Sequence, residues 1–203
     1  MIQVPRLAIK NIALCILLLT IAVAARAHSD QVETGGFVSG YLHPLTGFDH
    51  LLAMIAVGIW GATLGKPLVW ALPVTFPLLM VVGGVLGIAR VPIPFVETGI
   101  AASVVVLGLA IAAAWKAPTA VALAIISVFG VLHGHAHGTE LPSAASPAAY
   151  AAGFVVATGM LHLAGIAIGA LAVAPRGKQL LRGCGSLIAI AGVWILAGMP
   201  GAA

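Results

Sequence analysis

Six apolar segments, each long enough to cross a lipid bilayer, constrain the fold of this chain more than any other feature. A membrane-spanning helix needs about 20 predominantly apolar residues, and only 7% of the 203 residues are charged. Charged residues and prolines separate the segments, which we predict to be helices over residues 41–64, 68–89, 94–115, 118–137, 147–173 and 180–199. Residues 28–203 are therefore expected to form an all-α integral membrane protein, a six-transmembrane-helix bundle.

The first 27 residues have the pattern of a secretory signal peptide. Arg6 and Lys10 precede an apolar run, and Ala25-Arg26-Ala27 fits a cleavage site. The apolar run is shorter than a span requires, which favours a signal peptide over an uncleaved first helix. We expect cleavage before His28.

The basic residues indicate the orientation of the bundle. With an exported N-terminus, the loops after the first, third and fifth helices lie in the cytoplasm, where Lys and Arg are enriched. Those loops hold Lys66, Lys116, Arg176, Lys178 and Arg182, whereas the opposite loops hold only Arg90. Both mature termini are therefore expected outside. The basic residues are too dispersed to form a patch that would bind nucleic acid.

The first expected helix contains a polar run from His43 to His50. Ionisable residues at membrane depth are costly and mark functional sites. His43, His50 and Met54 are spaced to share about one face of a helix, and Gly47 permits a bend. Asp49 either binds a metal beside His50 or orients that imidazole by accepting its ring N–H.

A second polar run lies at the end of the fourth expected helix. His133 and His137 are four residues apart, the spacing at which two imidazoles can bind one ion, and Glu140 follows on the same stripe. His135 points to the other side of the helix, where it either binds at an entrance or packs against a neighbour. His162, in the fifth helix, is a further ligand or donates to a backbone carbonyl.

Two weaker candidates lie nearer the outer surface. Glu97 either neutralises a cation or is simply solvated at the interface. His28 would offer a free amine and an imidazole to a divalent ion if cleavage occurs as expected; alternatively, it belongs to a flexible soluble start. Cys184 would be the only cysteine of the mature chain, which leaves no internal disulfide.

The ligand types limit the choice of ion. Imidazoles and carboxylates, with one thioether and without thiolate, suit nickel, cobalt or another borderline divalent ion better than copper(I), structural zinc, magnesium or calcium. Nickel and cobalt are adjacent in the Irving–Williams order, so ligand type does not separate them. We expect no tightly bound cofactor.

Three motifs carry a resemblance to a known family. They are His43-Pro44-x-x-Gly47-x-Asp49-His50-x-x-x-Met54, His133-Gly134-x-Ala136-His137-Gly138-x-Glu140 and Leu161-His162. Together they resemble the HupE/UreJ family of small bacterial membrane proteins, over essentially the whole mature chain. The resemblance implies a secondary nickel permease of the inner membrane that serves hydrogenase or urease assembly, with nickel-enzyme accessory proteins as candidate partners.

We therefore expect a permease that passes Ni²⁺ inward, with Co²⁺ as the alternative cargo. The expected topology places both histidine runs at the outer side of the membrane, as two walls of one capture site. The expected path uses His43, Asp49, His50, His133, His137, Glu140 and His162.

Other functional classes remain open at this level. Paired membrane histidines also occur in haem proteins, and a metal sensor or accessory protein would need the same ligands without transport. We do not expect an enzyme, because the HExxH pattern of an intramembrane metallohydrolase is missing. The sequence also contains no Walker A motif, which favours transport driven by the membrane potential, and the titratable histidines leave proton coupling open.

Overall fold

The computed structural model describes residues 36–141 and 146–198, and within these ranges all regular secondary structure is helical. The predicted signal peptide and His28 lie outside the described residues. The helices are α2 (Gly36–Thr46), α3 (Phe48–Leu64), α4 (Leu68–Ile88), α5 (Val96–Ala112), α6 (Thr119–Thr139), α7 (Pro147–Gly169), a short 3₁₀ helix η2 (Ala170–Val173), and α8 (Gly177–Ala197).

Four helical segments of the described chain are long and apolar enough to cross a membrane. They are α4, α6, α7 continued by η2, and α8. The pair α2 and α3 would make a fifth span if it is taken as one bent unit, and α5 is apolar but only 17 residues long. At 1.5 Å per residue α5 extends about 26 Å, slightly less than a typical hydrocarbon core. The chain is thus a multi-pass membrane protein.

A sharp bend replaces the single helix predicted over residues 41–64. The axes of α2 and α3 differ by 80°, and Gly47 between them has an extended conformation. The Gly47 N–H still bonds the His43 carbonyl at 3.1 Å, and its own carbonyl receives the Leu51 N–H at 2.9 Å. One helix therefore ends and the next begins at the same residue. The prediction that His43 shares one helix face with His50 and Met54 was wrong for this reason.

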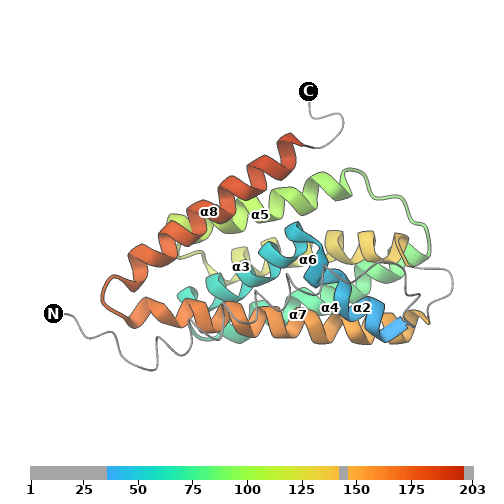
Figure 1. Ribbon diagram of the computed structural model, residues 1–203, viewed down its shortest axis with the longest axis horizontal. Coiled ribbons are helices and arrows are strands. Elements are labelled where there is room, and N and C mark those ends of the chain that lie inside the picture. The colour runs from blue at the N-terminus through green and yellow to red at the C-terminus, as the bar shows by residue number, and fades with distance from the viewer. Residues whose placement is uncertain (1–35, 142–145, 199–203) are drawn as a thin grey trace.

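Glycines bring the helices into direct backbone contact in pairs. In the α4–α6 pair, a Cβ atom on Gly134 would collide with the Met80 carbonyl. Gly58 of α3 and Gly165 of α7 face each other in the same way, as do Gly108 of α5 and the backbone of α8. Figure 1 shows α5 and α8 side by side along one edge of the bundle. Small residues allow this approach in lipid, and the contact at Gly165 is an example.

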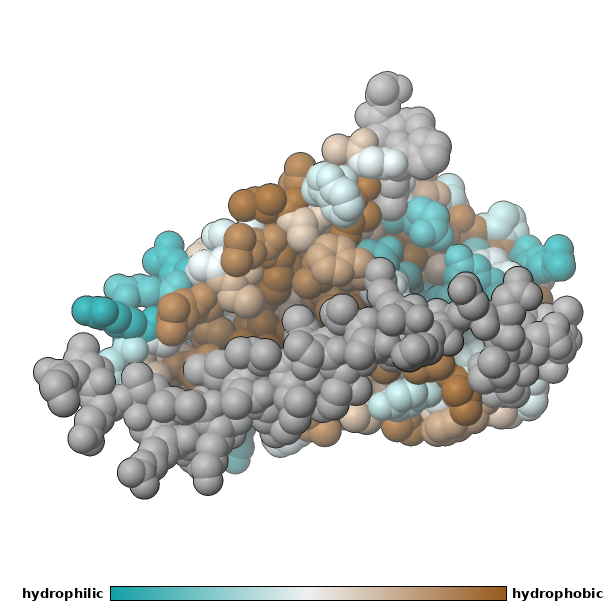
Figure 2. Space-filling view, viewed as in Figure 1, coloured by the Kyte–Doolittle hydropathy of each residue, from teal (hydrophilic) through white to brown (hydrophobic). Residues whose placement is uncertain are grey.

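The two ends of the molecule differ in their polar residues. Figure 2 shows hydrophilic residues gathered toward both ends of the long axis and hydrophobic residues between them. One end, called the basic end below, holds Lys116 and Arg182. The Lys116 ammonium donates to the Thr63 carbonyl, and Arg182 Nε donates to the Ala112 carbonyl at 2.8 Å. These carbonyls end α3 and α5, where a positive charge is favourable. The opposite end, which holds α2 and the C-terminus of α6, is called the histidine end below.

Candidate metal centre

Four histidines from three helices meet at the histidine end. His43 comes from α2, His50 from α3, and His133 and His137 from α6. The centroids of the His43 and His137 rings are 4.6 Å apart, those of His50 and His137 4.6 Å, and those of His50 and His133 5.0 Å. Across the α2–α3 bend, the ring centroids of His43 and His50 are 6.0 Å apart. The fold thus joins the two polar runs of the sequence into one histidine cluster, made of these four residues.

The His50 ring is oriented by the preceding residue. Its Nδ1 lies 2.7 Å from Asp49 Oδ1, and the same oxygen accepts the His50 backbone N–H at 2.8 Å. An ionised carboxylate can only accept, so Nδ1 carries a proton, and in the neutral imidazole the lone pair is on Nε2. That Nε2 is buried without a hydrogen-bond partner in the described part of the chain. This contact is the one expected of a carboxylate that orients a metal-binding imidazole.

Gly47 leaves the space that this pair occupies. A Cβ atom at position 47 would lie 3.1 Å from His50 Nδ1 and 3.3 Å from Asp49 Oδ1. Both distances are tighter than ordinary van der Waals contact. The residue that bends the chain therefore also admits the carboxylate–imidazole contact beside it.

The two histidines of α6 offer further ring nitrogens. His133 Nδ1 lies 2.8 Å from the Phe129 carbonyl one turn earlier, which leaves Nε2 free of a proton. His133 Nε2 and both ring nitrogens of His137 are buried with no hydrogen-bond partner among the described residues. Buried polar atoms in folded proteins are rarely left unpaired. Three neighbouring imidazoles with unpaired nitrogens can donate their lone pairs to an electron-pair acceptor such as a metal ion.

The cluster opens outward at His43 and Glu140. His43 Nε2 lies 3.6 Å from Glu140 Oε2, and their side chains are 33% and 53% exposed. One ligand atom from each of His43, His137 and Glu140 falls within 4.8 Å of the others, close enough to surround one ion. Burial, and then the negative charge of Glu97, raises the pKa of the Glu140 carboxyl. Glu140 is thus the outermost charged group of the site.

The remaining predicted residues fall into different places. Glu97 is exposed in the first turn of α5 and acts on Glu140 through its charge. His135 is buried but turned away from the cluster, and its Nε2 donates to the Val91 carbonyl at 2.7 Å. Of the two alternatives for His135, this geometry favours packing against the neighbouring segment.

Two further predicted residues lie deeper in the bundle. Met54 is fully buried, and its sulfur accepts the Thr158 hydroxyl at 3.4 Å. His162 is also buried, and its Nδ1 lies 3.1 Å from the Pro73 carbonyl. The carbonyl partner anticipated as one alternative for His162 is therefore present, but it occupies only one of the two ring nitrogens.

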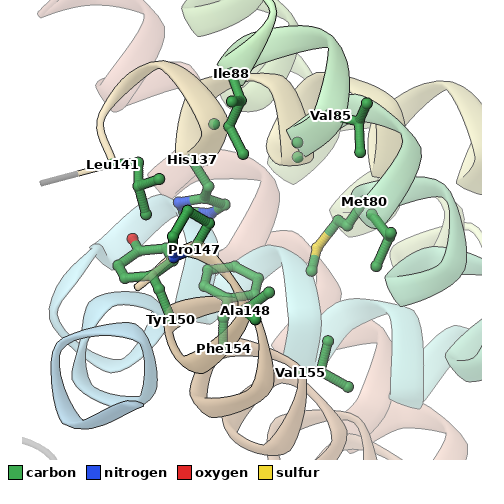
Figure 3. A pocket seen from close by; sticks show the side chains of 15 residues that line it. Met80, Val85, Ile88, His137, Leu141, Pro147, Ala148, Tyr150, Phe154 and Val155 are labelled. Carbon is green, nitrogen blue, oxygen red and sulfur yellow. The ribbon is translucent and has the colours of Figure 1, made fainter. Parts of the chain in front are cut away.

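An aromatic wall beside the cluster escaped the sequence analysis. The Phe154 ring centroid is 4.0 Å from that of His137, and the Tyr150 ring is 6.1 Å from that of His43. Figure 3 shows the His137 ring directed from α6 toward these two residues. Both also line an apolar groove of about 260 Å³ between α4, α6 and α7. The sequence did contain a signal for this wall: Tyr150 and Phe154 precede His162 at four-residue spacing, which places all three on one face of a helix.

These features define a class of protein: a multi-pass α-helical membrane protein with a buried histidine cluster at one end. The profile described as HupE / UreJ protein matches residues 16–195. Protein HupE from Rhizobium leguminosarum bv. viciae is 41% identical over 182 residues, which cover 89% of this chain and 95% of that protein. The chain belongs to the HupE/UreJ family. No solved structure matches it.

Proposed function

We propose that this protein is a secondary permease that carries Ni²⁺ into the cytoplasm, with Co²⁺ as the alternative cargo, for the assembly of hydrogenase or urease. The ion is captured at the histidine end by His43, His50, His133, His137 and Glu140. Asp49 acts by orienting His50. This proposal combines family membership with the geometry of the cluster.

The observation that carries the proposal is the set of unpaired ring nitrogens. His50, His133 and His137 come from two helices and bury nitrogens that have no partner within the described residues. A divalent ion would satisfy these lone pairs, and imidazole with carboxylate suits nickel or cobalt. The half-exposed Glu140 gives such an ion an anionic point of entry beside His43.

The direction of transport follows from the charge at the two ends. Cytoplasmic loops carry the excess of Lys and Arg, so we place the basic end in the cytoplasm and the histidine end outside, in the inner membrane of a bacterium. A divalent cation that enters a negative interior gains about 4 to 5 kcal/mol per 100 mV of membrane potential. Inward transport through this chain therefore needs no further energy source.

The geometry disfavours haem at the cluster. A porphyrin held between two histidines needs a flat slot that separates their rings, whereas the cluster rings lie with centroids 4.6 to 5.0 Å apart. The rings contact each other instead of facing each other across a slot. A metal sensor or accessory protein would use the same ligands, so transport itself must be measured.

The test uses the purified protein in liposomes with an inside-negative potential. Wild-type protein is expected to accumulate ⁶³Ni²⁺, and His50→Ala is expected to reduce the initial rate to the level of protein-free vesicles. His135→Gln is the matched control, because it removes another buried histidine that faces away from the cluster. Its uptake is expected to stay near that of wild type.

Two results would contradict the proposal. If wild-type protein binds Ni²⁺ but accumulates neither Ni²⁺ nor Co²⁺, it is a sensor or accessory protein. Uptake at the wild-type rate by His50→Ala would show that the histidine cluster does not take part in transport.

A further inference from the structure

His162 is a buried imidazole outside the histidine cluster, with one ring nitrogen left over. Its exposed fraction is 1%. A carbonyl can only accept, so the contact with Pro73 fixes the proton on Nδ1 and the lone pair on Nε2. That Nε2 is buried without a hydrogen-bond partner in the described ranges. Leaving such an atom unpaired is unfavourable unless something else binds it.

The carbonyl that holds His162 is available because of a proline. In a regular helix the Pro73 carbonyl would accept the N–H of residue 77. Residue 77 is also proline, which has no N–H, and it lies inside α4. The Pro73 carbonyl, which has no backbone donor in α4, therefore accepts from the His162 side chain of α7. Pro77 acts through Pro73 to set which nitrogen of His162 is free.

His162 is linked to the histidine cluster through one shared aromatic neighbour, Phe76. The Phe76 ring packs edge-on against His133 and against His162, with centroid distances of 5.2 and 5.5 Å. Along α7, His162 comes 12 residues after Tyr150, which corresponds to about 18 Å toward the basic end. Thr158 is one turn before it and contacts the Met54 sulfur. The lone pair of His162 is thus the next imidazole donor beyond the cluster.

We propose that His162 Nε2 is an inner transfer ligand for the divalent ion, distinct from the outer capture site, and that Pro77 is the residue that positions it. The ion leaves the histidine cluster, passes the Phe76 ring and binds His162 before it reaches the basic end. This inference rests on the proposed transport function. It separates two steps, capture and transfer, that different residues control.

The test measures the two steps separately. Equilibrium dialysis of the purified protein gives Ni²⁺ binding, and proteoliposomes give the initial ⁶³Ni²⁺ uptake rate. The variant His162→Asn keeps an amide N–H near the position of Nδ1 that can donate to the Pro73 carbonyl, and it removes Nε2, so a role in packing alone would survive. We expect the Ni²⁺ affinity to stay within about twofold of that of wild type. The initial uptake rate should fall by more than about tenfold, which is the loss typical when a partner of a metal ligand is altered.

A second variant tests the positioning by proline. Pro77→Ala restores an N–H that competes for the Pro73 carbonyl and releases His162. We expect a reduction in uptake of about tenfold, with binding retained. The matched control is His135→Gln, which changes a buried carbonyl-bonded histidine on the other side of α6 and should leave both measurements unchanged.

Each outcome decides the inference. Uptake at the wild-type rate by His162→Asn would overturn it while leaving the proposed permease intact. Loss of both binding and uptake by a folded His162→Asn protein would also overturn it, because His162 would then belong to the capture site. Wild-type uptake by Pro77→Ala would overturn the positioning role. Absence of uptake by wild type would reject the permease, and the transfer step with it.

Discussion

At the scale of single residues, the protonation of the imidazoles is set by acceptors close to them. His50, His133 and His162 each place Nδ1 against an oxygen, from Asp49, Phe129 and Pro73 respectively. In all three cases Nε2 is the nitrogen left with a lone pair. Metal-binding histidines in proteins are commonly oriented by such a partner on the other ring nitrogen.

The Asp49 carboxylate gives a prediction at this scale. The Asp49→Asn variant keeps an oxygen that can accept from His50 but loses the negative charge that makes the imidazole a better ligand. We expect the apparent Ni²⁺ affinity to fall by about 10- to 100-fold, measured by equilibrium dialysis of the purified protein. An unchanged affinity would show that the carboxylate has no orienting or electronic role. The thermal unfolding midpoint serves as the control for folding.

At the scale of elements, close approach of helices determines where the histidines stand. The backbone of α6 contacts α4 through Gly134 and Gly138, on both sides of His135. His133 and His137 belong to the same turns of α6. The glycines therefore hold these histidines at a fixed depth and rotation beside α3 and α7. Packing of small residues, more than any side-chain hydrogen bond, positions the site.

The α4–α6 contact can be tested with a matched pair of substitutions. Gly134→Ala places a Cβ atom against the Met80 carbonyl, and overpacking of this kind costs about 1–3 kcal/mol. We expect a lower thermal unfolding midpoint in detergent. Gly159→Ala, also in the middle of a helix, has open space around the added carbon and should leave the midpoint unchanged or slightly raised. Equal midpoints for the two variants would refute this account of the packing.

The elements also show where sequence reasoning failed. Residues 41–64 are apolar apart from the polar run His43 to His50, and their length and composition predicted one span. The break at Gly47 depends on backbone angles that hydrophobicity does not encode. The sequence permitted a bend there, but its 80° magnitude comes from the packing of α2 against α7 and of α3 against its own neighbours. Both contacts are tertiary.

At the scale of the whole molecule, most of the basic side chains and the histidine cluster lie at opposite ends. Lys116 and Arg182 bond helix-terminal carbonyls at the basic end, whereas Glu140 and His43 pair at the histidine end. The apolar middle connects the two ends through buried Met54 and His162. A route between unlike ends is the arrangement that directional cation transport requires.

The orientation in the membrane is the corresponding prediction. In a background with both cysteines replaced by alanine, Thr98→Cys is placed at the histidine end and Lys178→Cys at the basic end; both native side chains are exposed. A membrane-impermeant maleimide added to intact spheroplasts should label only Thr98→Cys, because cytoplasmic loops are the basic ones. Permeabilised cells should show labelling of both. The reverse pattern in intact cells would invert the proposed direction of transport.

The sequence by itself determined the class of the protein and the identity of its chemical groups. Apolar length requires helices in lipid because the backbone must satisfy its own hydrogen bonds there, and histidines in such helices mark a site. Only the tertiary structure decided which imidazoles meet, which nitrogen each one leaves free, and that Pro77 frees a carbonyl for His162. Those properties depend on contacts between helices distant in sequence, which local periodicity does not contain.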